Sequence, residues 1–141
     1  MKNSYLKKLG LVIIIILISF ACREEIIEPD NLVGKINEPV QVKDRNSYTC
    51  LLNAKNLTMN LSTLTYFSSA RTRFNIRLID YETGYTNISV QDLSNLERFR
   101  YFVAEDISYH TELLEGYVPS TINIITDNFT GKIIVEFRKT L

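Results

Sequence analysis

Residues Arg73–Asp80, with the sequence RFNIRLID, decide the fold class of this chain. Apolar side chains recur there at every second position, at Phe74, Ile76 and Leu78, and mostly polar side chains stand between them. Successive side chains of a β-strand point to opposite faces, so this alternation predicts a strand with one buried face and one solvated face.

The same alternation recurs on both sides of this stretch. Val40 and Val42, directly after a proline, predict a short edge strand. The polar segments 53–56 and 127–131 have the length of hairpin connections, and the segment 82–84 ends in glycine and predicts a turn. Further strands are therefore expected at residues 40–42, 48–52, 57–61, 86–91, 121–126 and 132–138.

The segment 92–104 fits two structures. As a strand it places Phe99, Tyr101 and Val103 on one face. As a helix capped by Asp92 it places a stripe of apolar residues on one side. The strand is the preferred prediction, and the helix remains an alternative that would make the fold α+β.

About seven or eight short strands without a long helical pattern predict an all-β fold, an antiparallel β-sandwich. Threonine, isoleucine, valine and aromatic residues dominate the predicted strands, as they do on half-buried pleated surfaces. The inward positions predict the core, which contains Phe74, Ile76, Leu78, Ile88, Val90, Ile122, Ile124, Ile133, Val135 and Phe137.

The N-terminus has the composition of a secretory signal. Lys2, Lys7 and Lys8 precede an uncharged run of 13 residues from Leu9 to Ala21. A helix that crosses a bilayer needs roughly 20 apolar residues, so this run is short for a membrane anchor. Residues 1–21 are therefore predicted to be a secretory signal peptide, with an uncleaved membrane anchor as the alternative.

The residues around Cys22 resemble sorting signals of bacterial lipoproteins. Ser19–Cys22 is similar to the lipobox, whose cysteine receives a diacylglycerol group, and two acyl chains bind a lipid bilayer stably. Arg23, Glu24 and Glu25 resemble the surface-export signal of Bacteroidota lipoproteins, and a solvated charged tether is the alternative interpretation. The resemblance implies an outer-membrane protein, lipid-anchored through Cys22 and exposed at the cell surface.

Composition and charge limit the classes of partner. Removing residues 1–21 from the 141 leaves 120, of which 13 are basic and 16 acidic, a net charge of about −3. This balance favours no nucleic-acid partner. Residues 22–37 lack periodicity and predict a flexible tether, and residues 38–141 predict one domain. Cys50 has no partner once Cys22 is lipidated, and we expect it to be a small buried apolar residue.

Three stretches of the predicted domain resemble the small immunoglobulin-like sandwich domains of unknown function found on Bacteroidota lipoproteins. They are the residues Tyr48–Leu61, the strand Phe74–Asp80 with its glycine turn at Gly84, and the closing strand Gly131–Phe137. The resemblance implies an immunoglobulin-like β-sandwich. It implies no functional residues, because that family has none established.

Catalytic chemistry has little support in the composition. The chain has one histidine, His110, so neither a Ser-His-Asp arrangement nor an ordinary zinc site is expected around it, and it is predicted to lie in a surface loop. Pairs of acidic residues occur where turns carry solvated charge. We therefore expect a protein that is not an enzyme and that holds no metal or cofactor.

Two groups of residues are candidates for binding. Arg73, Arg77, Arg98 and Arg100 would form an anion-binding patch if their strands share a sheet, and pairing with nearby acids is the alternative. The long connection 105–120 contains Tyr109, His110 and Tyr117, and long loops in compact domains are often functional.

These features predict a noncatalytic, membrane-anchored lipoprotein of the cell envelope. It would act as a surface binding or accessory module, with a protein or a glycan as its partner. A periplasmic inhibitor of a lysozyme or a protease is the alternative.

Overall fold

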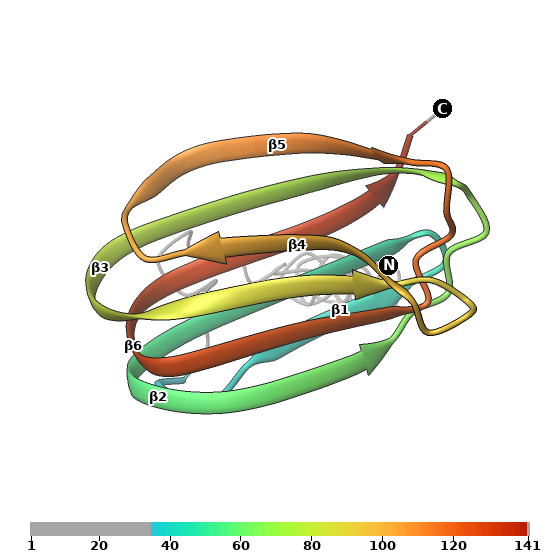
Figure 1. Cartoon of the computed structure of the whole chain (residues 1–141). Coiled ribbons are helices and arrows are strands. Elements are labelled where there is room, and N and C mark those ends of the chain that lie inside the picture. Colours follow the sequence, from blue (N-terminus) through green and yellow to red (C-terminus); the bar gives the residue numbers. More distant parts are fainter. Residues whose placement is uncertain (1–34, 141) are drawn as a thin grey trace, which may run out of the picture.

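The computed structural model describes residues 35–140, in which six strands form one antiparallel sheet and no helix occurs (Figure 1). The sheet order is β1-β2-β6-β3-β4, and β5 pairs with a separate part of β3. The strands are β1 (Val40–Asp44), β2 (Ser47–Leu64), β3 (Arg71–Gln91), β4 (Glu97–Val103), β5 (Ile107–Glu115) and β6 (Thr121–Lys139).

The three long strands bend near their midpoints, and the bends lie side by side. Ala54 of β2 pairs with Gly131 of β6, and Ile79 of β3 pairs with the adjacent Lys132. The register shifts at these positions, as it does at β-bulges, which bend strands. The sheet therefore folds over on itself at the left of Figure 1 and forms two layers.

The first layer contains β1, β5 and the segments 47–54, 71–79 and 131–139. The second layer contains β4 and the segments 57–64, 83–91 and 121–129. The predicted all-β antiparallel sandwich is thus confirmed, and one continuous folded sheet builds both of its layers.

The predicted hairpins at 53–56 and 127–131 and the turn at 82–84 are wrong, because each of these segments is a bend inside a long strand. The described residues therefore contain six strands instead of seven or eight. Asn56, Gly84 and Asn128 have positive φ angles of 49°, 79° and 47°. Tight turns and bulges both use this backbone conformation, so the same residue types occur in both.

The core lies between the two layers. The ring of Phe74 in the first layer contacts those of Phe99 and Tyr101 in the second, with centroid separations of 5.0 and 5.3 Å. Leu57, Met59 and Leu61 are half-buried against the core. Ten of the residues predicted to point inward are buried with an exposed fraction of 1% or less, namely Phe74, Ile76, Leu78, Ile88, Val90, Ile122, Ile124, Ile133, Val135 and Phe137.

The helix alternative for 92–104 is wrong. Residues 92–96 form a turn in which the amide of Asn95 donates to the carbonyl of Asp92, and the strand β4 follows. Val103 is buried, and Phe99 and Tyr101 are half-buried against the core, as predicted for the strand. The strand is favoured because β4 satisfies the backbone groups along the edge of β3, which a helix would leave unpaired.

The predicted edge strand at Val40 and Val42 is present as β1, but both valines are exposed. Gln41 points inward between them. Its Oε1 accepts hydrogen bonds from the hydroxyls of Tyr48, at 3.2 Å, and Thr63, at 2.6 Å. Because the two donors belong to different layers, this glutamine links the layers at the open edge.

The predicted signal peptide 1–21, Cys22 and the predicted export signal Arg23–Glu25 lie outside the described residues, as does most of the predicted tether. Within residues 35–140, Asn37 is hydrogen bonded to β2, because its backbone N–H donates to the backbone carbonyl of Asn53 at 2.7 Å. No helix in this range is long and apolar enough to span a bilayer.

Candidate functional site

The outer face of the second layer carries neutral polar side chains in regular rows. Strand pairing places Asn60, Ile125, Asn87 and Phe102 in one row across four strands. The alternation that sends Ile88, Val90, Ile122 and Ile124 into the core sends their sequence neighbours outward. We call this surface the amide face, and it comprises Asn60, Ser62, Tyr85, Asn87, Phe102, Asn123 and Ile125. Ser89 belongs to the same strand face but is buried.

An aromatic pair stands at one side of the amide face. The rings of Tyr85 on β3 and Phe102 on β4 lie 5.3 Å apart at an angle of 31°. Their exposed fractions are 36% and 61%, which is high for large apolar side chains. Neighbouring strands bring such aromatic pairs together, and here the pair remains open to solvent.

The charged groups at the amide face are already paired, including Arg100, which lies in the same cross-strand row as Ser62, Asn123 and Ser89. The Arg100 guanidinium donates two hydrogen bonds to Glu97, at 2.9 and 2.8 Å, and lowers the pKa of that carboxyl. Asp127 accepts hydrogen bonds from the Thr58 hydroxyl and from the side-chain amide of Asn128. The groups left for a ligand are therefore amides, hydroxyls and two aromatic rings.

Sequence reasoning missed Tyr85 and Phe102. One signal was present: Phe102 falls between Tyr101 and Val103, both predicted to point inward, so it had to be an apolar residue on the solvated face. That Tyr85 lies beside it depends on the register between β3 and β4, which pairs Thr86 with Val103.

The four predicted arginines do not form one patch, which corrects that hypothesis. Arg73 and Arg77 lie exposed on the first layer, whereas Arg98 and Arg100 belong to β4 in the second layer. The bend in β3 separates the two pairs of arginines. Arg73 and Arg77 precede the bend, whereas β4 pairs with the part of β3 that follows it.

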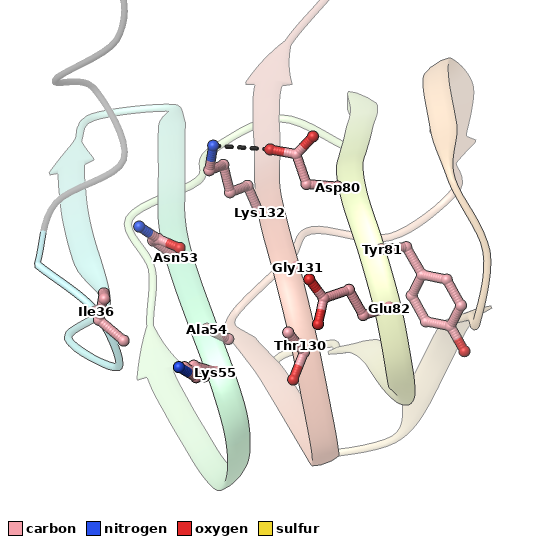
Figure 2. A pocket seen from close by; sticks show the side chains of 10 residues that line it. All are labelled: Ile36, Asn53, Ala54, Lys55, Asp80, Tyr81, Glu82, Thr130, Gly131 and Lys132. Carbon is pink, nitrogen blue, oxygen red and sulfur yellow. Dashed lines mark ion pairs between the residues drawn. The ribbon is translucent and has the colours of Figure 1, made fainter.

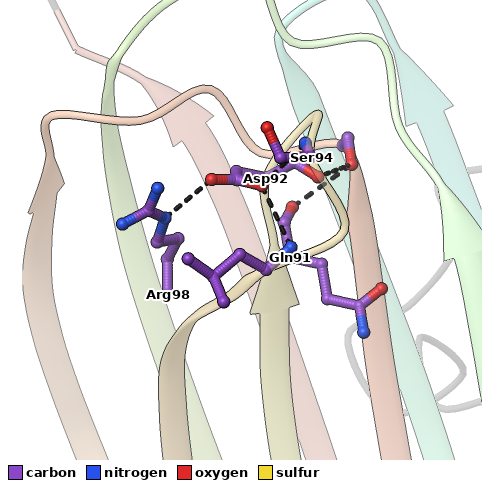
Figure 3. Close-up of polar contacts among 6 residues, drawn as sticks. Gln91, Asp92, Ser94 and Arg98 are labelled. Atoms are coloured by element: carbon purple, nitrogen blue, oxygen red, sulfur yellow. Dashed lines mark hydrogen bonds and ion pairs between the residues drawn. The ribbon is translucent and has the colours of Figure 1, made fainter.

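Arg98 has a structural partner instead of a free guanidinium. Its Nε donates to Asp92 Oδ2 at 2.6 Å (Figure 3). The other Asp92 oxygen accepts from the backbone amides of Ser94, at 2.8 Å, and Leu96, at 3.1 Å. The hydrogen bond from Arg98 is the main cause that lowers the pKa of Asp92. This network holds the turn between β3 and β4.

The predicted binding loop 105–120 is also corrected, because most of it is the strand β5 paired with β3. Tyr109 is exposed on the outer face of the first layer, and its hydroxyl donates to Asn75 Oδ1 at 3.2 Å. Tyr117 is half-buried against the core, and burial raises the pKa of its hydroxyl to about 12. The two tyrosines therefore do not form one exposed site.

His110 is a half-buried residue of β5 and not a loop residue. Its ring stacks on Tyr101 with a centroid separation of 4.7 Å, and its Nε2 lies 3.7 Å from a Glu112 oxygen. The histidine thus fills the open side of the sandwich between β4 and β5. Among residues 35–140, no group of three or more histidine, cysteine, aspartate or glutamate side chains is arranged to hold a metal ion.

A groove of about 550 Å³ follows the bends in the three long strands (Figure 2). Lys132 of β6 forms an ion pair with Asp80 of β3 at 2.7 Å, and Lys55 and Glu82 add one charge of each sign. Because its charges balance, the groove selects neither anions nor cations. The sequence did not predict this groove, because it exists only where the three bends align.

No family model and no curated protein matches this chain. Among solved structures, a Bacillus endospore appendage protein of disulfide-linked pili is 15% identical, covers 77% of this chain and 95% of its own, and has a TM-score of 0.44. A mutant family 29 carbohydrate-binding module complexed with cellulohexaose is 14% identical, with coverages of 78% and 86% and a TM-score of 0.40. The family 11 carbohydrate-binding module of a Clostridium thermocellum cellulosomal cellulase is 11% identical, with coverages of 74% and 82% and a TM-score of 0.36. At these identities and TM-scores, the likeness carries no information about ligand or activity.

Proposed function

We propose that this protein is a noncatalytic glycan-binding module and that the amide face is its binding surface. The observation that carries the proposal is the exposed Tyr85–Phe102 pair beside a field of uncharged amides and hydroxyls. A sugar ring has apolar C–H faces and a rim of hydroxyls. Aromatic rings contact the C–H faces, and side-chain amides donate hydrogen bonds to the hydroxyls and accept hydrogen bonds from them.

A neutral glycan suits this surface better than a charged one. The ionised side chains at its border, those of Arg100, Glu97 and Asp127, already have partners. Glycoside hydrolysis commonly uses two carboxyl groups on either side of the scissile bond, and the two acids at this border are held by an arginine and by hydroxyl and amide donors. These contacts support binding without cleavage.

Binding is tested with Tyr85→Ala and Phe102→Ala in the full chain, purified in detergent. Tyr66→Ala is the matched control, because Tyr66 is a 67% exposed ring that follows the end of β2 and lies outside the amide face. A glycan array of neutral oligosaccharides identifies the ligand, and calorimetry measures its affinity. Each aromatic truncation should weaken binding by roughly 10-fold, as expected for an anchor residue.

The control variant should bind like the unmodified protein. The proposal is wrong if the unmodified protein binds no neutral glycan, or if Tyr66→Ala loses as much affinity as the other two variants.

We further propose that Cys22 anchors this module to the outer membrane and that Arg23, Glu24 and Glu25 direct it to the cell surface. The order of basic, apolar and cysteine residues at the N-terminus supports the anchor. Cys22→Ala should release the protein from the membrane fraction or leave the precursor uncut. Replacing residues 23–25 by alanine should protect the domain from protease added to whole cells, and equal digestion of both forms would remove the export proposal.

A further inference from the structure

Two arginines face each other on the outer surface of the first layer. Arg73 of β3 is the direct cross-strand partner of Arg138 of β6, and its partner on the other side, in β5, is Leu113. Like charges directly opposite each other destabilise an antiparallel pair. The register therefore places Arg73 between a second cation and an aliphatic side chain, with no acid directly across from it on either strand.

The acids at the adjacent same-face register positions on β5 and β6 are already engaged with other arginines. Glu115 accepts from Arg71 at 2.8 Å, and Glu136 pairs with Arg138 at 3.2 Å. Within residues 35–140, Arg73 has no ion-pair partner. Its guanidinium is thus a free bidentate donor beside a second guanidinium.

A neighbouring side-chain amide lines the same region and has an unused donor group. Asn75 lies two residues from Arg73 on the same face of β3. Its Oδ1 accepts hydrogen bonds from the hydroxyls of Tyr109, at 3.2 Å, and Thr111, at 2.5 Å. Because two donors occupy the oxygen, the Nδ2 group of Asn75 is left to donate to a ligand.

These groups line one depression of about 460 Å³, together with Lys139 and Thr140. We propose that this depression binds a tetrahedral oxyanion, a sulfate or phosphate group. It lies on the opposite layer from the amide face, so this site is independent of the proposed glycan binding.

The donors on the outer face favour an anion with several oxygens. Arg73 and Arg138 provide two cations there, and Asn75 adds a neutral donor, while Glu136 is the one acid among the described residues of the rim. These donors exceed what the two oxygens of a carboxylate accept. A sulfate or phosphate group offers more oxygens and more charge, and guanidinium forks match such oxyanions well.

The site is tested in the full chain by titrating inorganic sulfate and phosphate against a chloride background of constant ionic strength. The Nε–H signal of Arg73 in ¹⁵N-edited NMR spectra reports binding directly. Arg73→Gln should weaken binding by roughly 10-fold or more, because the charge-assisted bonds are lost. Asn75→Asp should abolish binding, since it keeps the oxygen that Tyr109 and Thr111 contact but replaces the donor by a negative charge.

Arg77→Gln is the matched control. Arg77 lies on the same strand face and has the same charge, but it does not line the depression. Its replacement should change the affinity by less than about 2-fold, as expected for a screened charge at longer range. An equal loss in Arg73→Gln and Arg77→Gln would mean that general charge attraction, and not a site, binds the anion.

The source of the oxyanion is separated by two further probes. Dextran sulfate, compared with neutral dextran, tests an oxyanion carried on a polysaccharide. Vesicles of phosphatidylglycerol, compared with phosphatidylcholine, test a lipid phosphate. The site is supported if any oxyanion probe binds and this binding depends on Arg73 and Asn75. The proposal of an oxyanion site is overturned if none of the probes binds, and this outcome does not depend on whether the amide face binds a neutral glycan.

Discussion

The ring of Phe74 on β3 lies 5.0 Å from the ring of Phe99 on β4, although the two rings belong to different layers of the sandwich. Phe74 also contacts Phe137 of β6, at 5.1 Å, and is fully buried. Phe74 therefore packs the two layers of the folded sheet against each other.

Phe74→Ala should remove this contact and leave a cavity between the layers. We expect the free energy of unfolding to fall by about 3–5 kcal/mol. Arg77→Ala, three residues along on the solvated face, should change it by no more than about 0.5 kcal/mol. Urea denaturation of both variants measures the difference, and similar losses in the two would contradict the assigned strand face.

The bend in β3 depends on Gly84. Its φ angle is 79°, and a Cβ there would overlap the backbone of Asp127 and Asn128 on β6. Gly84→Ala should therefore destabilise the fold by strain and by collision, on the order of 3 kcal/mol. Thermal or urea unfolding provides the measurement.

Gly116 provides the control for that substitution. Its φ angle is 87°, but nothing lies within 4 Å of a Cβ at this position. Gly116→Ala should cost only the backbone strain, about 1 kcal/mol. If the two alanine variants were equally stable, the close approach of β3 and β6 at the bend would be refuted.

The Asp92–Arg98 pair should make stability depend on pH in the acid range. The Arg98 guanidinium lowers the pKa of Asp92 in the folded state. The carboxyl of Asp92 then binds a proton more tightly in the unfolded state than in the folded state. The contribution of the pair to the free energy of unfolding is therefore complete above the ordinary carboxyl pKa of about 3.9. It is lost as the pH falls through the lower pKa of the folded state.

Asp92→Asn should therefore have a lower Tm than the unmodified protein at pH 7, and this difference should shrink on acidification toward about pH 3. Glu82→Gln replaces an exposed acid and serves as the control. A difference that stays constant with pH would show that the ionised form of Asp92 contributes nothing to the turn.

Cys50 should be chemically inert in the folded protein. It is 1% exposed, and burial raises the pKa of its thiol to about 11. At pH 8 only about one thiol in a thousand would be the reactive thiolate, even if a reagent could reach it. In a Cys22→Ser background, Ellman's reagent should label Cys50 only in denaturant, and rapid labelling of the native protein would disprove its burial.

Local patterns in the sequence identify most of the strands and of the core. The alternation at Phe74, Ile76 and Leu78 needs no distant partner to be recognised, because side chains on a strand alternate faces wherever the strand pairs. The same holds for Ile133, Val135 and Phe137 and for the buried Cys50. β5 was missed because its inward positions include His110 and Glu112 at the open side of the sandwich, where polar groups are tolerated.

The candidate sites were much less predictable. Arg73 was predicted to be a binding residue, but its cross-strand partner Arg138 lies 65 positions away and is its neighbour only through the register between β3 and β6. Tyr85 and Phe102 likewise share a surface because β3 pairs with β4. No short-range pattern contains that information.

The sequence by itself determined which residues face the core in most of the strands, because alternation is a property of each strand taken alone. It did not identify the buried Phe129, which lies in one of the bends, or Leu114 of β5. Only the tertiary structure decided whether the segments at Asn53–Asn56, Glu82–Gly84 and Asp127–Gly131 reverse the chain as hairpins or bend it between layers. Both outcomes use the same turn residues and the same positive φ angles. The choice depends on which strand lies alongside, because the pairing of β2 and β3 with β6 is present on both sides of the bends. This pairing is lost if any one of the bends closes locally as a hairpin.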